Sequence, residues 1–225
     1  MGREVVGSVS EWSGMLKDLF RQIDDGSITL EQFQAFLEHK NPFLAVDFVE
    51  DWQNFYREVL GIECDFSNLR IPKREKGFNR LIIVAQGMTP QTIYDKCKEL
   101  FPSWKYTNEN LDDITTSERT SKAGAYAVWF RDNIEADEEL KNLSANDLKN
   151  RGILGITLEE RLLFELKYFK ETGKHLDIEN VTLCSGSRCS DGGVPYVRWY
   201  DGKLYVDWCY PGGRHGGLRS RRAVF

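Results

Sequence analysis

Residues 194–210 read VPYVRWYDGKLYVDWCY, and this stretch decides the fold of the C-terminal part of the chain. Apolar and polar side chains alternate on both sides of Asp201-Gly202, a dipeptide that favours a two-residue β-turn because both residues tolerate positive φ. The stretch therefore predicts a β-hairpin. The expected cross-strand pairs are Tyr196–Asp207, Val197–Val206, Arg198–Tyr205 and Trp199–Leu204.

The two faces of this hairpin differ in chemistry. One face is expected to pack as a scaffold, and its members are Val197, Trp199, Val206 and Trp208. The opposite face carries Tyr196, Arg198, Tyr200, Tyr205, Asp207 and Cys209. A slip of one residue would mix the two sets, so the sorting itself supports the register. We interpret the second face as the candidate functional surface.

The composition is that of a folded protein with an uneven charge. The chain has 225 residues, 41% of them hydrophobic and 12% aromatic, with a net charge of −5. Residues 185–225 hold seven basic and three acidic residues (+4), and the remainder holds 23 basic and 32 acidic residues (−9). A basic tail favours an anionic ligand. The tail is too short and too mixed with Asp to argue for nucleic acid by itself.

No apolar run approaches the roughly 20 residues that span a bilayer, and the N-terminus lacks the apolar core of a signal peptide. We therefore expect a cytoplasmic protein without membrane contact. The five cysteines are an odd number and imply no disulfide framework.

Helical spacing of apolar residues predicts three N-terminal helices, over 10–24, 29–40 and 44–60. Thr29 and Gln32 form a capping box at the start of the second helix, and Gly61 ends the third. We expect residues 1–61 to form a small bundle or helical hairpin. The stretch 24–32 lacks the oxygen ligands of a calcium loop at three positions.

Residues 62–225 are expected to form the second domain. Its clearest helix begins at the capping box of Thr157 and Glu160 and ends at Gly173. A polar loop is expected over 108–124, and a solvated acidic segment over 134–140. Further helices are predicted over 89–101 and 144–150, and strands over 80–86, 104–106, 125–130 and 181–184. The fold class is α+β, with helices early and an antiparallel sheet late.

Metal and catalytic motifs are weak. Cys184, Cys189, Cys209 and His215 lack the paired spacing of structural zinc sites, and we expect Cys184 in the core and Cys189 and Cys209 at exposed positions. None of the three histidines, His39, His175 and His215, lies in a nucleophile motif. We predict no metal, no cofactor and no catalytic set.

The tail has an unusual composition. After Glu179 it contains no Glu, Gln or Met. Its outward residues are mostly Tyr, Cys, Arg, Asp, His and Gly, all of which are reached from an Asn codon when the first two adenines change. Trp199, Trp208 and Lys203 are not reached in this way, and they fall at packing or turn positions.

Three segments carry a resemblance to a known family: GITLEERLLFELKYFKETGKHLD (155–177), VTLCSGSRCSDGGVPYVRWYDGKLYVDWCYP (181–211) and LRSRRAV (218–224). The chain resembles the variable proteins of diversity-generating retroelements over residues 155–224. The resemblance implies a C-type-lectin-like fold of the formylglycine-generating-enzyme type. It also implies a C-terminal surface, about residues 184–225, that adenine-directed mutagenesis diversifies.

On this basis we expect a ligand-binding protein that displays a variable Tyr/Arg-rich surface to a protein or other macromolecule. The expected variable positions are Cys189, Tyr196, Arg198, Tyr200, Tyr205, Asp207, Cys209, Tyr210, Gly212, Arg214, His215 and Gly216.

Two alternatives come from other classes of protein. One is a cytoplasmic hydrolase or nuclease that uses Cys209, His215 and Arg198, which requires these groups to converge in a cleft. The other is an adaptor that recruits a partner through Trp12, Phe20 and Trp52, although the spacing favours a helix-bundle core for these three residues.

Overall fold

The computed structural model describes residues 9–37 and 47–225. The chain divides into two compact units, Met1–Asp47 and Phe48–Phe225, and each is described by itself. Within the described residues, no helix is both long and apolar enough to cross a membrane.

The first unit contains α1 (Val9–Asp24) and α2 (Leu30–Leu37). The Thr29–Gln32 capping box is confirmed: the Thr29 backbone N–H donates to Gln32 Oε1 at 2.9 Å, and the Gln32 N–H donates to Thr29 Oγ1 at 3.2 Å. The expected extension to residue 40 and the expected start of a third helix at Leu44 lie outside the described residues.

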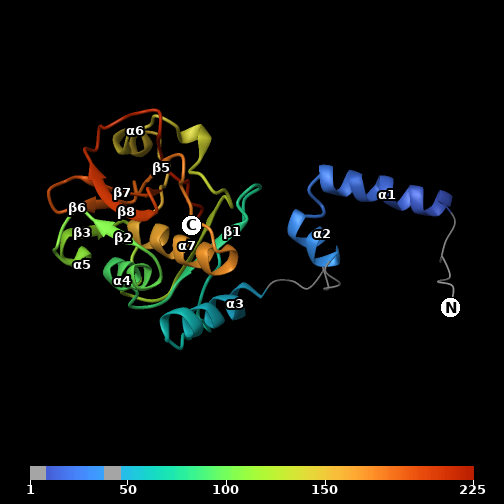
Figure 1. Cartoon of the computed structure of the whole chain (residues 1–225), viewed down its shortest axis with the longest axis horizontal. Coiled ribbons are helices and arrows are strands. Elements are labelled where there is room, and N and C mark those ends of the chain that lie inside the picture. Colours follow the sequence, from blue (N-terminus) through green and yellow to red (C-terminus); the bar gives the residue numbers. More distant parts are fainter. Residues whose placement is uncertain (1–8, 38–46) are drawn as a thin grey trace. The chain divides into compact units, whose positions relative to one another are not determined.

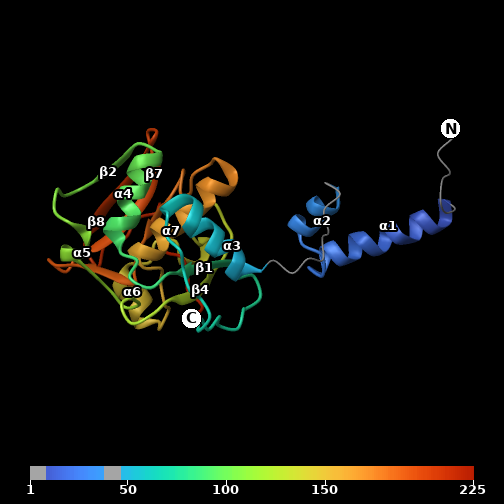
Figure 2. The same ribbon diagram turned by 90° about the horizontal axis from the view of Figure 1, so that it is seen from below.

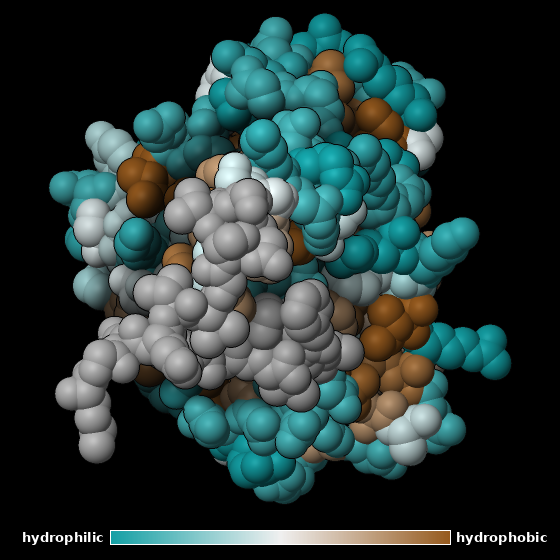
Figure 3. Space-filling model, turned by 90° about the vertical axis from the view of Figure 1, so that its right-hand side faces the viewer, coloured by the Kyte–Doolittle hydropathy of each residue, from teal (hydrophilic) through white to brown (hydrophobic). Residues whose placement is uncertain are grey.

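The apolar side chains of α1 are largely exposed. Trp12 is 49% exposed and Phe20 is 65% exposed. Helical spacing predicts which face of a helix is apolar, but it does not identify the element that covers that face. Figure 3 shows hydrophobic residues gathered in a few places on one face of the molecule that is otherwise largely hydrophilic.

The second unit is mixed α+β, as predicted, with three sheets (Figures 1 and 2). The largest has the strand order β2-β8-β7-β5-β9, a second pairs β1 with β4, and a third pairs β3 with β6. The strands are β1 (Arg80–Val84), β2 (Ser103–Lys105), β3 (Thr115–Ser117), β4 (Tyr126–Phe130), β5 (Val181–Leu183), β6 (Ser187–Cys189), β7 (Val194–Tyr200), β8 (Lys203–Cys209) and β9 (Leu218–Arg219). The helices are α3 (Phe48–Phe55), α4 (Pro90–Leu100), α5 (Leu111–Ile114), α6 (Ala145–Asn150) and α7 (Leu158–Thr172), with a 3₁₀ turn at Glu138–Leu140.

The late sheet is antiparallel only at its centre. β5, β7 and β8 pair antiparallel, whereas the edge strands β2 and β9 pair parallel with β8 and β5. Parallel pairing requires a long connection between the strands, and local patterning does not reveal such a partner.

Helix α3 belongs to the second unit, so the unit boundary lies at residue 47 rather than at the expected 61. The helix continues as a π-helical turn, Tyr56–Leu60, and ends at Gly61 with φ 69°. Trp52 Nε1 donates to the Leu81 carbonyl at 3.2 Å, and Tyr56 Oη donates to the Ile83 carbonyl at 2.8 Å. These side chains satisfy backbone acceptors of β1, which explains why α3 is part of this core.

Helix α7 lies between the hairpin sheet and the β1–β4 pair, and it contacts both β1 and β7 (Figure 1). The predicted capping box and the left-handed Gly173 at its C-cap are confirmed. Every residue from Leu158 to Lys167 is buried, including five with charged side chains. Leu162, Leu163 and Leu166 are buried, and Phe169 is only partly buried.

A buried charge cluster fixes α7 to the rest of the unit. Arg161 Nε donates to Asp177 Oδ2 at 2.9 Å, and Arg221 Nη2 donates to Asp177 Oδ1 at 2.8 Å. Arg161 Nη1 also donates to Glu165 Oε2 at 2.8 Å. Asp177, Arg161 and Glu165 have no solvent exposure, and Arg221 has almost none. The two arginines lower the pKa of Asp177 against the opposing effect of burial.

Two local expectations are wrong. Residues 108–124 are not a plain loop, because they contain α5 and β3. Residues 134–140 are not solvated throughout: Glu138 and Glu139 are exposed, but Asp137 is 1% exposed, and its Oδ2 accepts a hydrogen bond from the Arg222 N–H at 2.7 Å. The partners that explain both differences, β6 for β3 and Arg222 for Asp137, are distant in sequence.

We predict that Asp177→Asn destabilises the protein by about 3–5 kcal/mol, because it leaves two buried guanidinium groups short of a carboxylate. Asp177 has φ 54°, a backbone conformation that Asn tolerates well, so the substitution tests the charge rather than the backbone. Urea unfolding followed by circular dichroism measures the change.

The matched control is Asp201→Asn. Asp201 also has positive φ, 48°, but it is exposed in the hairpin turn. We expect its free energy of unfolding to change by less than about 0.5 kcal/mol. Equal effects of the two substitutions would contradict the role of the buried charge.

Candidate functional site

The hairpin register is confirmed in full. β7 and β8 pair antiparallel from Val194–Cys209 to Tyr200–Lys203, and the four expected pairs are among them. The turn residues Asp201 and Gly202 have φ values of 48° and 71°, as an Asp-Gly hairpin turn requires.

Three of the four scaffold residues pack on the main core, whereas Trp208 is half-buried and its ring lies 5.4 Å from that of Tyr210. Val197, Leu204 and Val206 are completely buried. Trp199 is partly buried and lies flat against the His175 ring, with ring centroids 3.3 Å apart and an interplanar angle of 6°. His175 Nδ1 lies 2.8 Å from Glu165 Oε1, so the stack joins the hairpin to the charge cluster of α7. His175 therefore has a structural role.

The opposite face is open near the turn. The Trp104 and Tyr205 rings lie 5.4 Å apart, the Tyr205 and Tyr200 rings lie 6.2 Å apart, and the Arg198 guanidinium lies 4.1 Å from the centroid of the Tyr200 ring. We name these four residues the aromatic row. Trp104 is 43% exposed and Tyr200 is 54% exposed. Aromatic rings and arginine in this arrangement offer apolar area, hydrogen bonding and cation–π contact.

Sequence reasoning missed Trp104 as a member of this surface. It predicted the short strand around residue 104 from alternation, but not its parallel pairing with β8, which places Trp104 beside Tyr205. The alternation of Trp104 and Tyr106 was the available signal. The pairing itself has no local signature in the sequence.

The same face is covered near the far end of the hairpin. Tyr196 and Cys209 pack against a second, smaller apolar cluster contributed by β5, β7, β9, α6 and the adjoining 3₁₀ turn. Tyr196 Oη donates to Asp207 Oδ2 at 2.9 Å. Burial and, after it, this hydrogen bond raise the pKa of Tyr196 to about 12. Tyr196 and Cys209 therefore combine a packing role with partial exposure.

The loop after the hairpin extends the surface. Tyr210 is 75% exposed, and Gly212, His215 and Gly216 are also exposed. Arg214 Nη2 donates to Asp147 Oδ1 at 2.6 Å, and the Asn146 N–H donates to the Pro211 carbonyl at 3.0 Å. The loop is thus tied to α6 while its side chains stay accessible.

Cys189 does not lie at an exposed position, contrary to the expectation. It is 6% exposed in β6, and its Sγ accepts a hydrogen bond from Tyr106 Oη at 3.5 Å. Burial raises the pKa of the Cys189 thiol. Cys184 lies in the core, as expected, and Cys209 is only half-buried. Cys189 lies in a strand that pairs with β3, and this pairing with a distant segment has no local signature in the sequence.

The basic tail is largely neutralised by the acidic body. Four of its six arginines form ion pairs: Arg214 with Asp147, Arg219 with Glu138, Arg221 with Asp177 and Arg222 with Glu75. The charge excess of the tail therefore gives less attraction for an anionic ligand than its composition indicates.

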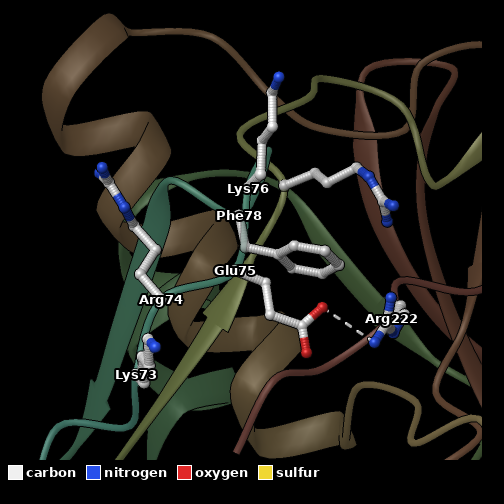
Figure 4. Close-up of a pocket in the computed structure, with 7 residues that line it drawn as sticks. Lys73, Arg74, Glu75, Lys76, Phe78 and Arg222 are labelled. Carbon is white, nitrogen blue, oxygen red and sulfur yellow. Dashed lines mark ion pairs between the residues drawn. The ribbon is translucent and has the colours of Figure 1, made fainter. Parts of the chain in front are cut away.

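A basic hollow of about 650 Å³ lies elsewhere on this unit, around Phe78 (Figure 4). The Glu75 carboxylate meets Arg222 at 3.0 Å, whereas the side chains of Arg74 and Lys76 point away from this pair. Arg131 lines the same hollow and is paired with Asp137. Two of its five basic residues, Arg131 and Arg222, are thus paired with carboxylates, and no residue of the hairpin contributes to this hollow.

The groups of the enzyme alternative do not form a catalytic set. In the described part of the chain no hydrogen bond joins Cys209, His215 and Arg198: Cys209 packs against the second cluster, His215 is exposed, and Arg198 stacks on Tyr200. Within residues 9–37 and 47–225 there is also no group of three or more His, Cys, Asp or Glu side chains arranged to hold a metal ion.

The three residues of the adaptor alternative differ in their exposure. Trp52 is 1% exposed and belongs to the core of the second unit, whereas Trp12 and Phe20 are exposed on α1.

Comparison of the chain with protein-family models, with curated proteins and with solved structures found no match.

We predict that Cys209 reacts slowly with iodoacetamide at pH 7.5. Burial, followed by the nearby Cys189 and Asp207, raises its pKa and so lowers its thiolate fraction, and the thiolate is the reactive form. Peptide mapping by mass spectrometry gives the rate at each cysteine, and glutathione serves as the reference thiol. We expect the rate at Cys209 to be lower than that of glutathione at pH 7.5 and to rise up to pH 9.5. Fast modification at neutral pH would instead indicate an activated nucleophile.

Proposed function

We propose that this protein binds a protein or another macromolecule through the aromatic row, the half-buried Tyr196 and Asp207, and the loop of Tyr210. The observation that carries this proposal is the sorting of the hairpin. Outward positions hold Tyr, Arg, Asp and Cys, all of which an Asn codon can produce when its adenines change. Tryptophan cannot arise in this way, and both tryptophans of the hairpin lie on the scaffold face. This sorting favours a variable protein of a diversity-generating retroelement.

The physical arrangement supports a recognition role. Tyr and Arg provide large contact areas and hydrogen bonds at a low cost in side-chain entropy. The strands beneath them are held by completely buried Val197, Leu204 and Val206 and by the Trp199–His175 stack. A surface of this kind can change its outward residues without losing its core.

A C-type-lectin-like architecture is part of the same proposal. The mixed α+β fold, with a long buried helix followed by an antiparallel hairpin near the C-terminus, supports it. The aromatic row adds Trp104, a residue outside the tail, to the recognition surface. We expect Trp104 to remain constant while its neighbours on β7 and β8 vary.

We predict that the outward face tolerates replacement. The triple variant Arg198→Ala, Tyr200→Ala and Tyr205→Ala is expected to change the free energy of unfolding by less than about 1.5 kcal/mol, because these side chains are wholly or partly exposed. Tyr196 is kept, because it packs against the second cluster. The matched control is Val197→Ala with Val206→Ala, which we expect to cost about 3–5 kcal/mol.

The binding function itself is tested with two display libraries. One randomises Arg198, Tyr200, Tyr205 and Tyr210, and the other randomises the same number of scaffold positions. Selection against immobilised lysozyme is expected to enrich folded, protease-resistant binders from the first library and none from the second. Failure of the first library to yield folded binders would contradict a display role.

We further predict a genetic signature. Sequencing of the locus and of its sister copies is expected to show substitutions concentrated at the exposed tail positions, including 198, 200, 205, 210 and 215, at adenines of the template repeat. A reverse transcriptase gene and a near-identical repeat of the tail sequence are expected nearby. Copies that differ evenly along the chain would argue against the retroelement.

A further inference from the structure

A second hollow, distant in sequence from the hairpin, lies between the start of α4, strand β3 and the first turn of α7. Its volume is about 410 Å³, which is within the range of small-molecule sites. The residues that matter for its chemistry are Thr89, Asp112, Thr115, Ser117, Lys122 and Glu159. No residue of the aromatic row or of the tail contributes to it.

Glu159 is the unusual member of this hollow. It is 3% exposed, and its Oε1 has no hydrogen-bond partner. The other four buried charged residues of α7 form ion pairs: Glu160 with Arg119, Arg161 with Asp177 and Glu165, Glu165 also with His175, and Lys167 with Asp51. Among the described residues Glu159 has no ion pair. A buried carboxyl oxygen without a partner calls for an explanation, because nearly all buried polar groups are hydrogen-bonded.

A second buried oxygen without a partner lines the same hollow. Thr115 Oγ1 accepts and donates no hydrogen bond in the described structure. Thr115 is the first residue of β3, and Glu159 lies in the first turn of α7, so the two groups come from separate elements. Glu159 and Thr115 thus line the hollow on two of its sides, and the two oxygens themselves have almost no solvent-exposed area.

The charges favour a cation over an anion. Three carboxyl groups line the hollow, Asp112, Asp113 and Glu159, against the single Lys122. The N-terminus of α4 does not supply the usual anion-binding N–H groups, because Gln91 N–H donates to Asp112 Oδ1 at 2.9 Å and Thr92 N–H donates to Thr89 Oγ1 at 3.3 Å. The carboxyl groups are not arranged to hold a metal ion. An ammonium group, with three N–H donors and one charge, matches these acceptors.

We propose that this hollow binds a small organic amine as its ammonium ion, with the Glu159 carboxylate as counter-ion and the Thr115 hydroxyl as a further acceptor. The amine occupies the place of the missing partner of Glu159. This inference is independent of the function proposed for the hairpin, because the two sites share no residue.

The protonation of Glu159 links binding to pH. Burial, followed by the charge of Glu160, raises the pKa of Glu159 to about 8, and Asp112 also raises this pKa, whereas the nearby Ser121 side chain lowers it. The empty hollow therefore holds mostly a neutral carboxyl group at pH 7. The other titratable groups that face Glu159 are Tyr56, Tyr126 and Lys122. Binding of an ammonium ion requires the carboxylate, so each bound amine displaces one proton to solvent.

The test uses benzylamine as the probe and benzyl alcohol as its neutral analogue, with the full chain and isothermal titration calorimetry. We expect saturable binding of benzylamine alone. Its dissociation constant is expected to fall about ten-fold from pH 6 to pH 7, because one proton must leave a group whose pKa lies above both values. Titrations in two buffers of different ionisation enthalpy are expected to show release of about one proton per amine at pH 6.

Two variants and a control separate this proposal from its rivals. Glu159→Gln keeps the shape and the hydrogen-bonding capacity, and we expect it to weaken benzylamine binding at least ten-fold and to abolish proton release. Glu118→Gln, at an exposed residue outside the hollow, is expected to bind as the wild type does. Lys122→Met removes the cation that competes with the ligand, so binding is expected to be equal or tighter.

Three results would contradict the proposed binding of an ammonium ion by Glu159. Equal binding of benzylamine by the wild type and by Glu159→Gln would exclude Glu159 as the counter-ion. Binding of inorganic phosphate that is lost in Lys122→Met would show an anion site instead. If Glu159→Gln does not fold, the pH dependence and proton release of the wild type still decide, and their absence would contradict the proposal.

Discussion

The carboxylate of Asp177 is the group on which the second unit depends. It has no solvent exposure, and it accepts hydrogen bonds from Arg161 on α7, from Arg221 near the C-terminus and from the backbone N–H of Ala136. Moving a charge out of water is costly unless several hydrogen-bond donors replace the water, and here these three segments and the Thr182 hydroxyl of β5 supply them. The cluster therefore requires α7, the 134–137 segment and the C-terminal segment to be in place together.

The hairpin is attached to this same cluster. The Trp199 N–H donates to the Asp177 carbonyl at 3.1 Å, and the Trp199 ring stacks on His175, which pairs with Glu165. The scaffold face is thus fixed by hydrogen bonds as well as by apolar packing. The aromatic row has no comparable attachment, because its side chains mainly contact one another. Variation on the outward side is compatible with a constant interior for this reason.

Not all of the outward face is equally free to change. Tyr196 and Cys209 pack on the second apolar cluster, and Cys189 is buried beside Tyr106. The proposed recognition surface is centred on the turn end of the hairpin and on the loop of Tyr210. Glu159 belongs to a different proposed site, in which one oxygen of a buried carboxyl group has no hydrogen-bond partner, whereas the other buried charged side chains of α7 form ion pairs.

The sequence by itself determined the hairpin, its turn and its register, the capping box of Thr157 and Glu160, and the mixed α+β class. These features depend on side-chain period and on contacts within a few residues, which local sequence encodes. Only the tertiary structure decided the place of Trp104 beside Tyr205, the burial of Cys189 and the pairing of Asp177 with Arg221, 44 positions apart. Burial and charge pairing depend on which distant segments meet, and no local pattern specifies that meeting.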